Sequence, residues 1–384
     1  MSLKRAIMTG MERSTHAPIW ISTPQGLSDL AAELMRHRLI GVDTESNSLF
    51  AYREQVCLLQ FSTTEHDYLV DTLALDDLSP LRRVFAHRSI EKIFHAAEYD
   101  IICLKRDYGF TFNNLFDTMQ AARILGWEAL GLGAILENLY GVQVDKRFQR
   151  ANWARRPLSD EQVYYASQDT HYLIRLREHM RNELLRSRRM TLAQEDFKRL
   201  TKVEGSNGEK NGSCWKAVGK NELTPRQMAV FKALWLLRET LAEKMDRPPF
   251  KVLTNQALVD LAKASPASLA ELETIPGVGH NNVRRIGNDL LKAVQHGLTA
   301  EPPVRSPSRR PDDAYMNRLE RLKQWRKATA RAMGVESDVV LPRDLMEHAA
   351  SDHPHTLEEL QHIMQDTPWR FRHFGSQLVQ VINT

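Results

Sequence analysis

The chain has 384 residues, which is enough for two or three domains. Apolar residues make up 42% and charged residues 26% of it, so it can bury a core, and a wholly disordered protein is excluded. No window approaches the roughly 18 uncharged apolar residues of a membrane helix, and the basic N-terminus has no apolar stretch typical of a secretory signal. Three scattered cysteines (Cys57, Cys103 and Cys214) exclude a disulfide framework and a cysteine-based zinc site, and they favour a reducing cytoplasm.

The basic residues outnumber the acidic ones only in the second half of the chain. The whole sequence has 52 Lys and Arg against 48 Asp and Glu, a net charge of +4. Residues 1–200 contain 26 of each sign, whereas residues 201–384 contain 26 basic and 22 acidic residues. This asymmetry is a mild indication that the C-terminal part binds a polyanion.

The first segment alternates between strand and helix patterns. Short apolar runs predict strands, and longer amphipathic stretches around them predict helices. The predicted strands are 39–43, 56–61, 68–70 and 92–94, and the predicted helices are 27–38, 78–87, 99–106, 118–125, 132–139 and 160–185. Ser159 and Gln162 form a capping box before the last helix. This order predicts an α/β domain with a mixed sheet flanked by helices.

Two stretches have the composition of linkers. Residues 205–213 are rich in Gly, Asn and Ser, and residues 301–313 are rich in Pro and basic. We therefore predict domains at 1–204, 218–298 and 314–384, joined by linkers at 205–217 and 299–313, and we expect the halves to be separable.

The second and third domains form an internal repeat. At a constant offset of 88 residues, Arg238 matches Arg326 and Ile275 matches Ile363, with apolar pairs between them. Both copies have helical patterns, which predicts two small all-α domains.

Five residues of the first domain form an ordered set with chemical meaning. Asp43 and Glu45 follow an apolar strand at i, i+2 spacing, which places both carboxylates on one face of the sheet. Asp100 follows a later strand, and Tyr165 and Asp169 lie four residues apart on the predicted helix 160–185. Taken separately, each part has an ordinary structural explanation: the Asp-x-Glu pair as a solvated strand end, Asp100 as an acid in the first turn of a helix, and the last two residues as a surface pair. The ordered set is far more specific than any of its parts.

On these residues the first domain resembles the DEDDy 3′→5′ exonuclease domain of the ribonuclease D family. The matching stretches are 42–45, 94–100, 116–118, 144–158 and 164–169. The second domain resembles an HRDC domain through its helix pattern and the Ile275–Gly279 hairpin, and the third resembles a degenerate HRDC domain that has lost this hairpin. The resemblance implies a ribonuclease H-like α/β domain followed by two small helical domains.

The resemblance also implies the chemistry. Two divalent ions, Mg²⁺ or Mn²⁺, would be held by hard carboxylate oxygens. Asp43 would bridge both ions, Glu45 and Asp169 would hold the ion that binds the attacking water, and Asp100 would hold the other. Tyr165 would orient the water, because a phenol with a pKa near 10 is a poor base at neutral pH.

Other residues leave their alternatives open. Asp117 is either a helix N-cap or a further catalytic group. His95 either lines the site or packs as a hydrogen-bonded histidine. Lys146, Arg150 and Trp153 belong to a basic and aromatic stretch. It is either a wall of a single-strand channel, with aromatic rings that stack on bases, or a solvated loop whose Phe148 and Trp153 pack inward.

The Ile275–Gly279 hairpin gives the second domain a similar choice. Gly277 and Gly279 allow a tight turn before a helix whose first N–H groups could meet a phosphate. The other interpretation is a plain helix connection.

The expected function is a cytoplasmic, monomeric 3′→5′ exoribonuclease that trims unstructured 3′ ends of tRNA precursors and other stable RNAs to nucleoside 5′-monophosphates. The first alternative is the same reaction on DNA, and the second is a non-catalytic RNA-binding scaffold. The absence of a helicase P-loop favours RNA, and the complete carboxylate set opposes the scaffold.

Overall fold

A computed structural model describes residues 17–205, 214–219, 222–304 and 312–384. These residues divide into two compact units. One unit contains the described residues of 1–46, 56–205 and 310–384, and the other contains residues 47–55 and the described part of 206–309. The predicted linkers 205–217 and 299–313 lie partly outside the described residues, so the predicted domain boundaries stay predictions.

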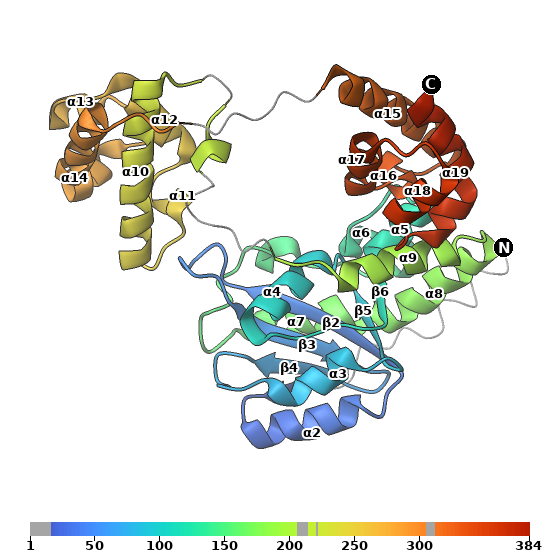
Figure 1. Ribbon diagram of the computed structural model, residues 1–384. Coiled ribbons are helices and arrows are strands. Elements are labelled where there is room, and N and C mark those ends of the chain that lie inside the picture. The colour runs from blue at the N-terminus through green and yellow to red at the C-terminus, as the bar shows by residue number, and fades with distance from the viewer. Residues whose placement is uncertain (1–16, 206–213, 220–221, 305–311) are drawn as a thin grey trace. The chain divides into compact units, whose positions relative to one another are not determined.

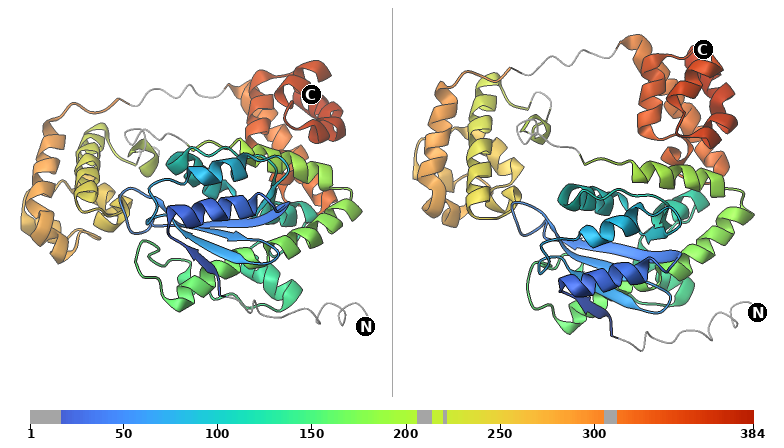
Figure 2. Two further views of the ribbon diagram at one scale, coloured as in Figure 1. Left: turned by 90° about the horizontal axis from the view of Figure 1, so that it is seen from below. Right: turned by 60° about the horizontal axis from the view of Figure 1, so that its bottom comes forward.

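The first unit is built on a six-stranded mixed sheet in the order β1-β4-β3-β2-β5-β6, flanked by helices (Figures 1 and 2). Strand β2 runs antiparallel to β3 and parallel to β5. The strands are β1 (Ile19–Ile21), β2 (Leu39–Ser46), β3 (Val56–Ser62), β4 (Asp67–Asp71), β5 (Glu91–Phe94) and β6 (Leu115–Asp117). The four predicted strands are confirmed. Strands β1 and β6 have three residues each, too few to show an alternating pattern.

The central strand β3 is buried along its whole length, as expected for a strand covered on both faces. The helices of this domain are α2 (Pro24–Leu34), α3 (Arg82–Ala86), α4 (Glu98–Tyr108), α5 (Thr118–Leu125), α6 (Leu132–Tyr140), α7 (Asp160–His171), α8 (Leu173–Arg186) and α9 (Met190–Thr201). Two short 3₁₀ turns, η2 (Ser79–Leu81) and η3 (Lys146–Phe148), complete it. Helix α9 was not among the predicted helices.

The long helix predicted over 160–185 is two helices, α7 and α8, with Tyr172 between them. Its predicted start is confirmed, because the Ser159 hydroxyl accepts from the Gln162 N–H and the Gln162 side chain accepts from the Ser159 N–H. Helix α7 lies very close to strand β2. A Cβ atom at Gly41 would be 2.9 Å from the carbonyl oxygen of Thr170, so only glycine permits this approach.

The second unit contains the first helical domain, with its own apolar core around Phe231, Leu258 and Leu290. Its helices are α10 (Pro225–Lys244), α11 (Pro249–Val252), α12 (Asn255–Ala264), α13 (Leu269–Glu273) and α14 (Gly279–Thr299), preceded by the 3₁₀ turn η5 (Cys214–Ala217). The third domain has the same order: α15 (Asp313–Met333), α16 (Ser337–Val340), α17 (Arg343–Asp352), α18 (Leu357–Ile363) and α19 (Pro368–Asn383).

Equivalent arginine side chains make the same hydrogen bond in the two copies of the repeat. Arg238 donates to the carbonyl of Leu253 at 3.2 Å, and Arg326 donates to the carbonyl of Leu341 at 3.0 Å. The 88-residue offset therefore relates the two helical domains in structure as well as in sequence.

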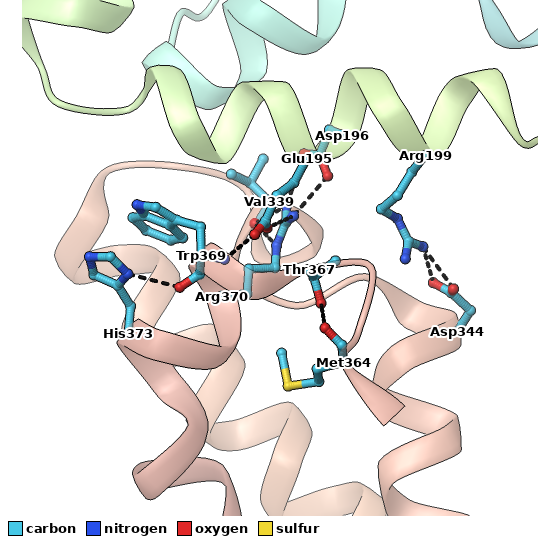
Figure 3. A network of polar contacts seen from close by, with 10 residues as sticks. All are labelled: Glu195, Asp196, Arg199, Val339, Asp344, Met364, Thr367, Trp369, Arg370 and His373. Carbon is cyan, nitrogen blue, oxygen red and sulfur yellow. Dashed lines mark hydrogen bonds and ion pairs between the residues drawn. The ribbon is translucent and has the colours of Figure 1, made fainter. Parts of the chain in front are cut away.

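The third domain packs against the exonuclease-like domain, with α19 in contact with α9 (Figure 1). Val339 is buried in the core cluster of the sheet domain, and Trp369 packs against the same cluster. Figure 3 shows the polar part of this contact, where the Arg370 guanidinium lies between Glu195 and Asp196. The third domain is thus docked on the first, which the sequence pattern did not predict.

Candidate active site

Three of the predicted carboxylates meet at the end of strand β2. Asp43 and Glu45 project from β2, and Asp169 comes from helix α7. One carboxylate oxygen of each residue lies within 4.8 Å of the other two, which is the arrangement of a divalent-cation site. The close approach of α7 at Gly41 brings Asp169 to this strand.

Asp100 reaches the same region from the first turn of α4. Its side chain is 7% exposed, and the Thr44 hydroxyl donates to its Oδ1 at 2.5 Å. Asp100 is not one of the three residues whose oxygens meet, but its charge adds to the rise in the pKa of Glu45 that burial and the other two acids cause. Nothing in the sequence singles out Thr44, which fixes Asp100 from between the two acids of the Asp-x-Glu pair.

The pKa values of the four carboxylates reflect burial and, for three of them, the neighbouring acids. Burial raises the pKa of Asp43, Glu45, Asp100 and Asp169, and mutual repulsion adds to this rise for the first three. Among the residues that the structure describes, no basic side chain contributes to any of these pKa shifts. A set of hard oxygen donors with uncompensated negative charge fits a divalent metal ion.

Tyr165 is placed to act on the same site. Its side chain is buried, its hydroxyl is hydrogen-bonded to Asp169, and its ring packs 6.0 Å from Trp153 and 5.9 Å from Phe148 between centroids. Burial and the neighbouring acids raise the pKa of Tyr165. Its hydroxyl therefore keeps its proton at neutral pH and acts as a donor.

Asp117 is the N-cap of α5, which is one of its two predicted interpretations. Its carboxylate accepts from the N–H groups of Met119 and Gln120 at 2.8 and 3.0 Å. His95 lies next to this helix, with Nδ1 2.9 Å from the Thr118 hydroxyl. Burial lowers the pKa of His95 to about 4, so the ring is neutral at pH 7 and offers a phosphate no charge.

The basic and aromatic stretch divides into exposed and buried parts. Lys146 and Arg150 are exposed. The Trp153 ring is 1% exposed and packs on Tyr165, so the expectation that it stacks on a base differs from the structure, which places it in a core. Arg156, also in this stretch, forms an ion pair with Asp71 at 2.6 Å.

A cavity of about 380 Å³ lies between this stretch and the exposed side of α7. Its lining includes Val144, Arg147, Phe148, Tyr164 and Tyr165. Tyr165 thus borders both the cavity and the carboxylates, and Tyr164 is 60% exposed.

In the second unit, Gly277 and Gly279 have positive φ values of 81° and 65°. Helix α14 begins at Gly279. The predicted tight turn is present. The contact of these glycines with nucleic acid stays a prediction.

The comparisons with known proteins agree with this architecture. Residues 18–185 match a 3′-5′ exonuclease family, and residues 227–294 and 316–382 each match the HRDC domain family. The chain therefore combines a DEDD-type 3′-5′ exonuclease domain with two HRDC domains. None of its described helices is long and apolar enough to cross a membrane.

Curated relatives fall into two groups. Exosome complex exonuclease RRP6 of Saccharomyces cerevisiae is 31% identical over 297 residues, which cover 73% of this chain but 40% of the relative. Ribonuclease D of Nitrobacter hamburgensis is 28% identical over 343 residues, which cover 86% of this chain and 88% of the relative. The chain thus spans less than half of the RRP6 relative, whereas it spans most of the ribonuclease D relative.

Solved structures show the same likeness. The catalytic core of RRP6 from Trypanosoma brucei has a TM-score of 0.66 and 27% identity, and the match covers 75% of this chain and 81% of that one. Escherichia coli RNase D, described as an exoribonuclease involved in structured RNA processing, has a TM-score of 0.69 over 92% of this chain and 100% of that one. At 23% identity the latter match supports the fold alone.

Proposed function

We propose that this protein is a metal-dependent 3′→5′ exoribonuclease of the ribonuclease D type. It would trim unstructured 3′ extensions of tRNA precursors and other stable RNAs and release nucleoside 5′-monophosphates. The convergence of Asp43, Glu45 and Asp169 within 4.8 Å, in a domain that matches 3′-5′ exonucleases, carries this proposal. A monomeric state and a cytoplasmic location are further parts of it.

The metal site is assigned to the four carboxylates. Asp43 would hold two divalent ions, Glu45 and Asp169 one of them, and Asp100 the other. Mg²⁺ or Mn²⁺ bound there would supply activation of a water molecule and charge stabilisation on the phosphoryl oxygens. Two contacts position these acids for metal binding: Thr44 fixes the Asp100 side chain, and the glycine at position 41 lets α7 bring Asp169 close to strand β2.

Tyr165 is assigned to orient the attacking water. Its raised pKa keeps the phenolic proton on the oxygen at neutral pH, so the hydroxyl donates a hydrogen bond and does not remove a proton. Its ring is held by the Trp153 and Phe148 rings, which fixes the direction of the hydroxyl.

The RNA strand would reach the site along the basic stretch. Lys146 and Arg150 are exposed and flank in sequence the residues Arg147 and Phe148, which line the cavity that Tyr165 borders, and they would meet phosphates there. The His95 ring, neutral at pH 7, would line the site without charge. The Gly277 and Gly279 turn of the first HRDC domain is the proposed contact for more distant parts of the RNA.

The test is a cleavage assay that compares two substrates under three conditions, two with a metal ion and one with a chelator. The full chain receives 3′-tailed tRNA or a single-stranded DNA of the same tail sequence, with Mg²⁺, Mn²⁺ or EDTA, and products are separated by chromatography. We expect nucleoside 5′-monophosphates from the RNA in both metals and no product in EDTA. Faster cleavage of the DNA would favour the DNA exonuclease, and RNA binding without any product would favour the scaffold.

A further inference from the structure

The Asp117 carboxylate makes more hydrogen bonds than a helix cap requires. Two of its four partners, the N–H groups of Met119 and Gln120, belong to the first turn of α5. The other two are the N–H groups of Ala96 at 3.2 Å and Ala97 at 2.7 Å, which belong to a different part of the domain. Capping of α5 explains the first pair and leaves the second pair unexplained.

Ala96 and Ala97 form the turn between strand β5 and helix α4. Ala96 has a φ of 65°, a left-handed conformation that an alanine adopts only when its surroundings hold it. Ala97 is the N-cap residue of α4, and its methyl side chain offers this helix no cap. Asp117 pairs with Phe94 in the parallel register of β5 and β6, so it lies beside this turn and accepts from the N–H groups of both turn residues.

Asp100 lies in the first turn of the helix that this turn starts. Its backbone follows Ala97 by three residues, so a change at the turn moves its carboxylate relative to Asp43 and Asp169. The Thr44 hydroxyl holds the side chain of Asp100 by a hydrogen bond to its Oδ1.

We infer that Asp117 is a positioning residue for the metal site: by holding Ala96 and Ala97 it places Asp100 for the divalent ion. This inference rests on the proposed role of Asp100 as a metal ligand. The competing interpretation is that Asp117 only caps α5 and contributes stability. The two interpretations differ in how the metal affinity of the protein changes when the hydrogen bond from the Ala97 N–H to Asp117 Oδ2 is lost while the three bonds to Oδ1 remain.

The variant that separates them is Asp117→Asn in the full chain. An asparagine still caps a helix through its one amide oxygen, but its amide nitrogen cannot accept from the Ala97 N–H. The control is Thr23→Ala, which removes the N-cap of α2. There the Thr23 hydroxyl accepts from the Gly26 N–H at 3.2 Å. This cap belongs to a helix that contributes none of the four acids. A third variant, Asp100→Asn, tests the proposed site itself.

Two quantities are measured on each protein: Mn²⁺ binding to the metal-free protein by calorimetry, and kcat and KM on a short single-stranded RNA. For Asp117→Asn we expect Mn²⁺ binding to weaken by about tenfold or more and kcat to fall with it, while KM changes little. Thr23→Ala should lose stability and keep both Mn²⁺ affinity and kcat. Asp117→Ser, which also caps α5, replaces Asp117→Asn if the latter does not fold.

Unchanged Mn²⁺ affinity and kcat in Asp117→Asn, with a stability loss like that of Thr23→Ala, would overturn the inference and leave Asp117 as a cap. Undiminished Mn²⁺ binding and cleavage by Asp100→Asn would instead remove the proposed role of Asp100, and with it the basis of the inference. Loss in Asp100→Asn and in Asp117→Asn together supports both.

Discussion

At the scale of single residues, the site concentrates negative charge that the fold does not neutralise. Asp43 and Asp169 approach each other where burial has already made ionisation unfavourable, and both have raised pKa values. An acid whose pKa is higher in the folded chain than in the unfolded chain destabilises the fold as the pH rises through that range. The metal-free protein is therefore expected to be less stable than its packing alone would allow.

The first prediction concerns Asp43→Asn. The neutral amide removes one charge from the cluster, so the free energy of unfolding of the metal-free protein should rise by about 0.5–2 kcal/mol, while cleavage falls by orders of magnitude. Urea unfolding in EDTA and a single-turnover assay measure the two effects. The matched control is Asp76→Asn on the exposed surface, which should change neither. Undiminished cleavage by Asp43→Asn, or by the natural chain in EDTA, would contradict the metal mechanism.

The second prediction concerns Tyr165→Phe. The variant keeps the ring that packs on Trp153 and Phe148, so the melting temperature should barely move. It loses the hydroxyl, so kcat should fall by about tenfold or more while RNA affinity in EDTA stays near normal. A large loss of stability with normal activity per folded molecule would show that the tyrosine is structural.

At the scale of elements, the stretch between α6 and α7 separates a packing role from a binding role. Trp153 lies in a small core with Tyr165 and Ala166, whereas Lys146 is exposed at the turn η3. The same stretch therefore packs against α7 with one side chain and exposes a positive charge with another.

The third prediction compares Trp153→Ala with Lys146→Ala. Loss of the buried indole should cost about 3–5 kcal/mol of unfolding free energy, and Lys146→Ala should leave stability unchanged. Lys146→Ala should weaken RNA binding and reduce the salt dependence of log K by about one unit. Thermal unfolding and RNA titrations at several salt concentrations give both numbers. Stable Trp153→Ala with weakened RNA binding would reverse the two roles.

At the scale of the whole molecule, the two HRDC domains share one helix order, and the second copy uses the region of the lost glycine hairpin to contact the exonuclease domain. In the second copy Asp366, one of the positions that replace the glycine hairpin, pairs with Lys202 at 2.6 Å at the end of α9. Just beyond these positions, the backbone N–H of Trp369 donates to Glu195 of α9. Basic residues of the exonuclease domain meet acids of the third domain here, as Arg199 meets Asp344 in Figure 3. The linker pattern indicates separable halves, but a chain cut at residue 204 would expose this face.

The fourth prediction concerns Arg370, whose side chain is fully buried and bonded to Glu195, Asp196 and the Val339 carbonyl. Arg370→Ala leaves the Glu195 charge buried without its partner, which should cost about 3–5 kcal/mol. Arg372→Ala, on the exposed side of the same helix, should change stability by less than about 0.5 kcal/mol. Urea unfolding of both variants is the measurement, and equal stabilities would mean that the Arg370 contacts contribute nothing to the stability of the docked domain.

The sequence by itself determined the features that depend on neighbours along the chain. The strand periodicity, the capping box at Ser159 and the 88-residue repeat are local patterns, and the order of the acids along the chain pointed to one chemistry. Only the tertiary structure decided which partners meet across the chain. The Asp117 bonds to Ala96 and Ala97, the burial of Trp153 and the contact of Arg370 with Glu195 join residues that are far apart in sequence or follow no period. Such contacts depend on how the packed elements approach one another, which no local pattern records.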